Sequence, residues 1–171
     1  DAQQKQERQI TAIRNFIHQG VDYIVLAPTT EKGWDTVLAE AKAAGIPVII
    51  IDRMIDSSLA TGDMGDDLFT CWIGSDFLGE GRDAAHWMDD HFSGKPLRIV
   101  HLQGNIGSTA QIGRTSGLNE ALSAHPEWEL VYRETGDFTQ AKGQELVEAL
   151  LADGIEFDLI FSENDNMAYG A

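Results

Sequence analysis

Cysteine is nearly absent from this sequence, which has only Cys71 among its 171 residues. A single cysteine cannot close an internal disulfide bond, and the paired cysteine spacing of a structural zinc site is missing. Cys71 lies within the apolar segment Leu68–Ile73. Because free cysteine is among the residue types most often buried, we expect Cys71 to pack in the core.

Basic residues are also scarce. The chain has 12 lysines and arginines against 28 aspartates and glutamates, which gives a net charge of −16. A nucleic-acid partner requires a basic surface, and none is present, so we expect no nucleic acid to bind. No run of about 18 apolar residues occurs, which argues against a transmembrane helix. The strong acidity favours a monomer, because like charges repel.

Motifs for catalysis and cofactor binding are missing or out of context. The sequence contains no P-loop and no G-x-S-x-G nucleophile turn. Gly79–Ala84 matches the dinucleotide pattern G-x-G-x-x-A, but it does not directly follow a strand, and Glu80 would repel a pyrophosphate. The five histidines are dispersed; His86 and His91 do not have the i, i+4 spacing of a zinc pair, and we expect solvated side chains. We therefore predict no enzyme activity, no cofactor and no metal.

What the sequence does contain is a regular alternation of strands and helices. Apolar, β-branched segments recur about every 25–30 residues, with helical patterns between them. The expected strands are Val21–Ala27, Pro47–Ile51, Leu68–Ile73, Leu97–Leu102, Trp128–Arg133 and Phe157–Phe161. The expected helices include Gly79–His91, Ala110–Ala124 and Ala141–Ala152. This alternation predicts an α/β fold with doubly wound parallel sheets. The apolar run at 48–51 predicts a strand buried on both faces.

Both ends of this pattern are abrupt. The first helix has no strand before it, and the last helix, which starts at Asn164, stops after about two turns. This predicts that the chain is a piece of a longer polypeptide. The acidic segment Gly62–Asp67 is the one loop-like stretch where the chain could cross between two lobes.

Polar residues follow nearly every predicted strand. They are Pro28-Thr29-Thr30, Asp52-Arg53, Ser75-Asp76, Gln103-Gly104, Gly136-Asp137-Phe138 and Asn164-Asp165. Ligands of open α/β sheets bind at the carboxyl ends of the strands. Carboxylates, guanidinium groups and carboxamides can each hydrogen-bond two neighbouring hydroxyls, as a sugar presents them.

Several of these strand-end residues, and Arg114 on a predicted helix, each have a plainer alternative. Asp52 and Arg53 are also compatible with a surface salt bridge or a turn. Arg114 shares the apolar stripe of its helix and should point into the cleft above the sheet, unless it forms a buried ion pair. Phe138 is suited to stack on a sugar ring, or it packs its loop against a helix. Asn164 is a candidate ligand residue that could equally be a helix N-cap.

The ordered set of these motifs resembles the ribose-type periplasmic binding proteins of sugar ABC importers, and within them the galactofuranose-binding branch. The matching segments include Gly20-Val21-Asp22, Ile51-Asp52-Arg53, Ser75-Asp76, Leu102-Gln103-Gly104, Arg114, Gly136-Asp137-Phe138-Thr139 and Asn164-Asp165-Asn166-Met167-Ala168. The sequence departs from the family pattern at Phe77, where asparagine is usual.

The resemblance implies two similar Rossmann-like lobes, both incomplete here, with residues 1–75 in the first and 76–171 in the second. It implies a periplasmic or extracellular protein, with a membrane-anchored lipoprotein as one form, that captures a monosaccharide by hinge closure. The implied partner is the permease of a sugar ABC transporter. The family's sugar-contacting residues correspond to Asp52, Arg53, Ser75, Arg114, Phe138 and Asn164.

Two other functions fit parts of the sequence. The same fold serves as the ligand-sensing domain of LacI-type regulators and of sensor kinases, which would be distinguished by a DNA-binding or transmembrane segment in the flanking sequence. A Rossmann-like enzyme would instead bind NAD through Gly79–Ala84.

Overall fold

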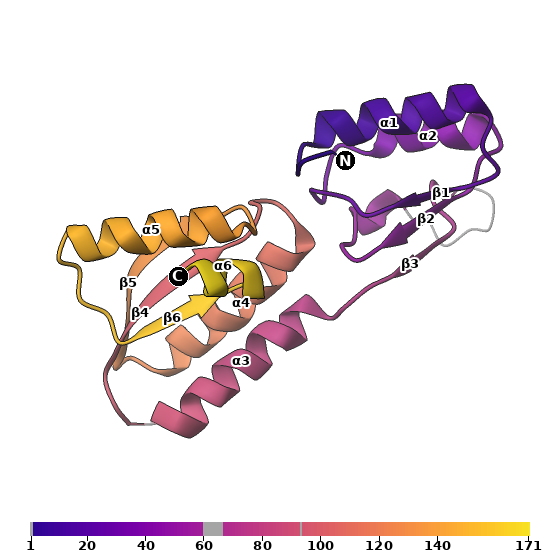
Figure 1. Cartoon of the computed structure of the whole chain (residues 1–171). Helices are drawn as coiled ribbons and strands as arrows, with labels where there is room; N and C mark the ends of the chain where they lie inside the picture. The colour runs from indigo at the N-terminus through magenta and orange to yellow at the C-terminus, as the bar shows by residue number, and fades with distance from the viewer. Residues whose placement is uncertain (1, 60–66, 93) are drawn as a thin grey trace. The chain divides into compact units, whose positions relative to one another are not determined.

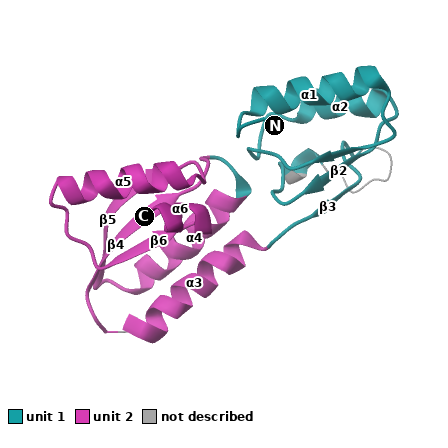
Figure 2. Ribbon diagram, in the orientation of Figure 1, with its two compact units in different colours: residues 1–75, 107–109 teal, residues 76–106, 110–171 magenta. Residues whose placement is uncertain are grey.

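A computed structural model of the chain describes residues 2–59, 67–92 and 94–171. These residues form two compact units (Figure 2). Unit 1 comprises the chain up to Ser75 together with Gly107–Thr109, and unit 2 comprises residues 76–106 and 110–171. The main division falls after Ser75, where the sequence placed the change of lobe; that the units correspond to two lobes of a binding protein stays a prediction. Residues 62–66 of the expected crossing segment lie outside the described residues.

The described elements alternate between helix and strand, as the sequence predicted (Figure 1). Unit 1 contains α1 (Gln6–Gln19), β1 (Ile24–Leu26), α2 (Asp35–Ala43), β2 (Val48–Ile51), the 3-10 helix η1 (Ser57–Leu59) and β3 (Cys71–Ile73). Unit 2 contains α3 (Phe77–Phe92), β4 (Leu97–Gln103), α4 (Thr109–Ala124), β5 (Trp128–Thr135), α5 (Gln140–Ala152), β6 (Leu159–Ser162) and α6 (Asp165–Gly170).

The sheet of unit 1 is parallel, with the order β1-β2-β3. Its inward-facing side chains pack against α1 and α2 through a core that includes Trp34 and Leu38. Ile49 and Ile51, on the opposite face of β2, are only half-buried. The expectation that residues 48–51 are buried on both faces was therefore wrong. The reason is that the helices described in unit 1 cover one side of the strand (Figure 1).

The sheet of unit 2 is also parallel, with the order β5-β4-β6. Successive side chains of a strand point to opposite faces, and β4 uses both. Val100 and Leu102 belong to a core cluster with α5 and α6, whereas Ile99 belongs to a second cluster with Met88 of α3 and Leu118 of α4. Helices thus cover both faces of this sheet, which confirms the predicted α/β class with parallel sheets (Figure 1).

The glycines of Gly79–Ala84 serve the packing of helices. The whole segment lies inside α3 and not in a turn between a strand and a helix. A Cβ atom on Gly81 would lie 2.7 Å from the backbone oxygen of Arg114, and one on Gly117 would lie 2.5 Å from the backbone of Gly81. Glycine therefore permits the close approach of α3 and α4. This location does not match the phosphate-binding turn of a dinucleotide site.

Two predictions about single residues were wrong. Cys71 is exposed, because β3 is an edge strand and all three of its residues face outward to some degree; Phe69 takes the core position instead. His101, expected to be solvated, is fully buried on the central strand β4. Across the described ranges, no helix combines the length and the apolar character needed to cross a membrane.

Candidate ligand-binding site

In unit 1, Asp52 and Arg53 directly follow β2, as predicted. Asp52 has a left-handed backbone, with φ of 63°, which is unusual for a residue other than glycine. Its N–H donates to Ile73 O at 3.0 Å, and its carbonyl accepts a hydrogen bond from Trp72 Nε1 at 3.2 Å. These bonds attach the turn after β2 to β3.

The two charged side chains of this turn differ in exposure. The carboxylate of Asp52 is 54% exposed, whereas the side chain of Arg53 is only 12% exposed. Arg53 Nε lies 3.6 Å from Asp52 Oδ2, and Arg53 Nη1 donates to Gln4 Oε1 at 3.2 Å. The guanidinium is thus enclosed while the carboxylate remains accessible to a ligand. The salt bridge that the sequence left as an alternative is present.

Ser75 is exposed and follows β3 after Gly74. The adjacent Asp76 has a different task, because its Oδ1 accepts the N–H of Gly79 at 2.9 Å in the first turn of α3. Ser75 therefore offers an accessible hydroxyl, whereas the carboxylate of Asp76 caps the start of α3.

In unit 2, Asn164 and Phe138 lie together. Asn164 is the N-cap of α6, and its Oδ1 accepts the N–H of Met167 at 3.0 Å. Its Nδ2 donates to the carbonyl oxygen of Phe138 at 3.1 Å. Phe138 is buried rather than exposed, has a φ of 59°, and packs its ring over Gly104. The packing and capping alternatives are thus both realised, and the ligand roles of the two residues stay predictions.

Arg114 lies on α4 and is held by three groups. Its Nε and Nη2 donate to Glu80 Oε2 at 2.9 and 2.7 Å, and its Nη1 donates to Glu163 O at 2.6 Å. The guanidinium carbon lies 5.0 Å from the centre of the Phe77 ring, within cation–π range. The ion pair is partly exposed, because 22% of the Arg114 side chain is accessible.

Arg114 and Asn164 line one cavity of about 280 Å³ in unit 2. Its other polar lining residues are Glu80, Ser162, Glu163 and Asp165. The cavity lies where β6 ends, which is the edge of the sheet where ligands of open α/β folds bind. The structure therefore brings Arg114, Phe138 and Asn164 together in unit 2, and Asp52, Arg53 and Ser75 belong to unit 1.

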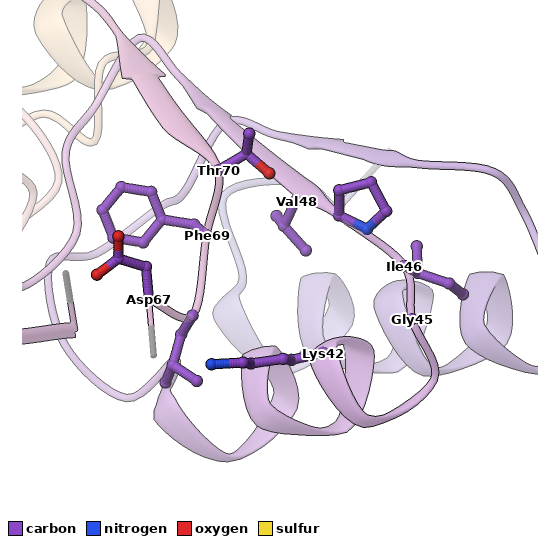
Figure 3. A pocket seen from close by; sticks show the side chains of 9 residues that line it. Lys42, Gly45, Ile46, Val48, Asp67, Phe69 and Thr70 are labelled. Carbon is purple, nitrogen blue, oxygen red and sulfur yellow. The ribbon is translucent and has the colours of Figure 1, made fainter. Parts of the chain in front are cut away.

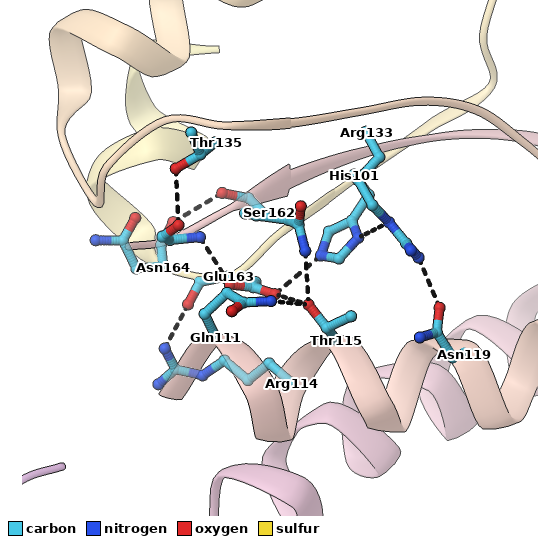
Figure 4. Close-up of polar contacts among 12 residues, drawn as sticks. His101, Gln111, Arg114, Thr115, Asn119, Arg133, Thr135, Ser162, Glu163 and Asn164 are labelled. Carbon is cyan, nitrogen blue, oxygen red and sulfur yellow. Dashed lines mark hydrogen bonds and ion pairs between the residues drawn. The ribbon is translucent and has the colours of Figure 1, made fainter. Parts of the chain in front are cut away.

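Sequence reasoning missed a polar group at this cavity, in which the lining residue Glu163 is joined by His101, Thr115 and Arg133 (Figure 4). The side chains of His101 and Glu163 are fully buried and hydrogen-bonded to each other at 3.0 Å. Burial lowers the pKa of the Arg133 guanidinium, which contacts His101. The available signal was a charged residue directly before Asn164 and a histidine inside an apolar strand.

A larger cavity of about 430 Å³ lies at the amino end of β2 in unit 1, the opposite end from Asp52 (Figure 3). Its lining is mainly apolar, with Val48, Leu68 and Phe69, and its charged members are Lys42 and Asp67. We place the candidate site at the carboxyl ends of the strands despite the smaller volume there, because that edge gathers the hydrogen-bonding groups. No cluster of three or more metal-ligating side chains occurs among the residues described.

Comparison with known proteins supports the resemblance to periplasmic binding proteins that the sequence predicted. Residues 1–171 match the model of the periplasmic binding protein domain. The galactofuranose-binding protein YtfQ of Escherichia coli K12 is 38% identical, with the alignment covering all of this chain and 53% of YtfQ. The chain therefore spans about half the length of this curated relative.

Two of the similar solved structures come from different kinds of system. The periplasmic binding protein of the arabinose ABC transporter from Shewanella sp. ANA-3, bound to L-arabinofuranose, is 46% identical with a TM-score of 0.87; the match covers all of this chain and 55% of that one. The fructose-binding periplasmic domain of the hybrid two-component system BT1754 is 27% identical with a TM-score of 0.84, covering 98% of this chain and 53% of that one. The match over the whole sequence and the parallel α/β units lead to one conclusion: this chain belongs to the periplasmic binding protein family.

Proposed function

We propose that the full-length protein is an extracytoplasmic solute-binding protein that captures a monosaccharide in its furanose form. Binding occurs without chemical conversion, and closure of two lobes on the sugar creates the surface that the permease of an ABC transporter recognises. The observation that carries this proposal is the set of hydrogen-bonding side chains at strand ends in both units. The furanose preference is supported by relatives whose names or bound ligands are furanoses, YtfQ and the Shewanella arabinose protein among them.

The geometry of Arg114 suits two neighbouring hydroxyls. A guanidinium has five N–H donors, and three donor atoms of Arg114 are engaged with Glu80 and Glu163. One further N–H on each of Nη1 and Nη2 has no acceptor among the described residues, so each is available to a sugar hydroxyl. Asp52 supplies the complementary group, because its accessible carboxylate accepts hydrogen bonds from hydroxyls.

The remaining candidates support these two. Arg53 is enclosed beside Asp52 and keeps the local charge balanced, while Asn164 holds the backbone of Phe138 in place. Phe138 offers an aromatic ring, and Ser75 offers an exposed hydroxyl. We propose that units 1 and 2 are parts of the two lobes, that the protein acts as a monomer in the periplasm or outside the cell, and that a lipoprotein anchor is one form it takes.

The test is calorimetric titration of the full-length protein with galactofuranose, arabinofuranose and matched pyranosides. We expect binding to at least one furanose, with Asp52→Ala and Arg114→Ala each weakening it by at least about tenfold, because charged hydrogen bonds are lost. Arg82→Ala is the control, since Arg82 pairs with Glu120 on the exposed surface of α3 and α4. No detectable binding to any of the sugars, or full affinity in both site variants, would contradict the proposal.

A second candidate is a sensory domain of the same fold, favoured by the similarity to the periplasmic domain of BT1754. Such a domain would bind sugar through the same residues but would be joined to a membrane segment and a signalling domain. Sequencing the complete gene distinguishes the two functions.

A further inference from the structure

Glu163 places a carboxylate in the interior of unit 2. Its side chain and that of His101 are both fully buried. A buried carboxylate is strongly destabilising unless its oxygens are hydrogen-bonded or paired with charge. The hydrogen-bonding groups around Glu163 therefore indicate the structural role of its carboxylate.

The directions of the hydrogen bonds around Glu163 can be assigned. A guanidinium only donates, so Arg133 Nε, 3.0 Å from His101 Nδ1, makes that nitrogen an acceptor. The ring proton of His101 is then on Nε2, which donates to Glu163 Oε1 at 3.0 Å.

Two further donors reach the same carboxylate. Thr115 Oγ1 donates to Glu163 Oε1 at 2.7 Å, and the N–H of Gly104 donates to Oε2 at 2.7 Å. Thr115 Oγ1 itself accepts the amide groups of Gln103 and Gln111, both at 3.0 Å, which directs its own proton toward Glu163. The surroundings of Glu163 thus consist of donors arranged for an ionised carboxylate (Figure 4).

We propose that Glu163 is the positioning residue of the unit 2 half of the binding site, a role that rests on the proposed sugar-binding function. Its carboxylate fastens the turn between β6 and α6 to β4, through Gly104, and to α4, through Thr115. The same turn presents the carbonyl oxygen that accepts Arg114 Nη1 and the side chain of Asn164.

Phe138 is also connected to Glu163. Asn164 binds the carbonyl oxygen of Phe138, and the ring of Phe138 packs over Gly104, whose N–H is bound by Glu163. Arg114 therefore contacts Glu163 directly, Asn164 follows it in the chain, and Phe138 is connected to it through Asn164 and Gly104. Buried polar groups of this kind contribute little net stability compared with apolar packing, so a role in geometry explains the charge better.

The test uses the full-length protein and a furanose that the wild type binds. Glu163→Gln keeps the size of the side chain but turns an NH₂ group toward at least one of the three donors. We expect a folded protein whose affinity falls at least about tenfold. The matched control is Glu120→Gln on α4, because Glu120 pairs with Arg82 at 2.7 Å on the surface and the change should leave affinity within about twofold.

A double-mutant cycle separates positioning from plain stability. The effect of Glu163→Gln should shrink when Arg114 is already alanine and should persist in full when Asp52 is alanine. A lower melting temperature with unchanged affinity, or additive effects in both backgrounds, would overturn the proposal. A wild type that binds no sugar would instead refute the proposed function and this role with it.

Thr115→Val is the second variant, because it removes one donor to the carboxylate and keeps the charge. We expect it to lower the affinity by roughly threefold to tenfold. If Glu163→Gln does not fold, an unchanged affinity in Thr115→Val overturns the proposal, and the expected loss supports it.

Discussion

The two units hold their candidate binding residues by different means. In unit 1 the backbone positions the candidate residues. Asp52 has a left-handed conformation, its N–H donates to the carbonyl oxygen of Ile73, and its own carbonyl lies close against Gly74. In unit 2 buried side chains position the candidate residues, because Glu163 and its donors fix the turn that carries Asn164. The candidate residues of unit 1 therefore depend on main-chain geometry, and those of unit 2 depend on a buried carboxylate.

The units share one property despite this difference. Asp52 and Phe138 are both candidate binding residues, and both have a positive φ, as does Asp137. Such conformations cost about 1–3 kcal/mol each and persist where the surrounding structure enforces them. Backbone strain at candidate residues is thus common to both units, whereas the contacts that enforce it differ. Substitutions that act on the backbone should thus disturb unit 1 more.

The largest effect should come from two glycines. A Cβ atom on Gly74 would lie 2.1 Å from Asp52 O, and one on Gly104 would lie 1.8 Å from the Phe138 ring. We expect Gly74→Ala to destabilise the protein by about 3 kcal/mol and Gly104→Ala by about 1–2 kcal/mol, because a ring can pivot and a backbone carbonyl cannot. Denaturant unfolding measures both values, and calorimetry should show weaker sugar binding in both variants.

Gly45→Ala is the control for this pair. Gly45 differs from the pair in having a positive φ of 71°, and beyond its chain neighbours no described atom lies within 4 Å of the position its Cβ would take. It should cost about 1 kcal/mol through backbone strain alone and leave sugar affinity unchanged. If Gly104→Ala destabilised the protein more than Gly74→Ala, the inference that unit 1 depends on its backbone and unit 2 on its side chains would be wrong.

Asp52 allows strain and chemistry to be separated. Asp52→Gly and Asp52→Ala both remove the carboxylate, so both should lose sugar affinity to the same degree. Only glycine adopts the left-handed backbone without penalty, so Asp52→Gly should be more stable than Asp52→Ala by about 1 kcal/mol. Urea unfolding provides the comparison. Equal stabilities would show that the left-handed turn does not persist without aspartate.

The fold was largely predictable because its signals are local. The β-branched run after Pro47 and the apolar segment from Leu97 each became a central strand of a parallel sheet. The failures came from position in the sheet, which periodicity does not encode. Cys71 is exposed because β3 is an edge strand, and Ile49 is half-buried because the described helices of unit 1 cover the other face.

The candidate site was predictable where a polar residue follows a strand, as Asp52 and Asn164 do, and where a charged residue interrupts the apolar stripe of a helix, as Arg114 does. Glu163 precedes Asn164 and was not predicted, because its partners are far away in the sequence: Thr115 is 48 residues distant and Gly104 is 59. Phe77 was visible as a departure from the family pattern, but its place beside the guanidinium of Arg114 depends on the packing of α3 and α4. Contacts of this kind arise from topology and not from local sequence.

The smallest effect should appear in the surface ion pairs of the two units. Arg14 lowers the pKa of Glu40 by hydrogen bonding to its carboxylate, and this is the pair that joins α1 to α2. The pKa of Asp158 is lowered chiefly by the backbone N–H of Arg98 and then by its guanidinium. Arg98 also binds Glu156 at 2.7 Å, so unit 2 keeps a partner for this arginine when Asp158 is neutral.

A carboxyl group whose pKa is lower in the folded state stabilises the protein above its unfolded pKa, and this contribution is lost as the pH falls through the folded value. Glu40→Gln and Asp158→Asn should therefore lower the melting temperature at pH 7, and both deficits should fade below about pH 4. We expect the smaller deficit for Asp158→Asn, because Glu156 remains on Arg98. Melting curves across pH and salt test this, and both deficits should shrink with added salt. A deficit that persisted in acid would mean that these carboxylates contribute by packing and not by charge, in which case the surface of neither unit is held by its ion pairs.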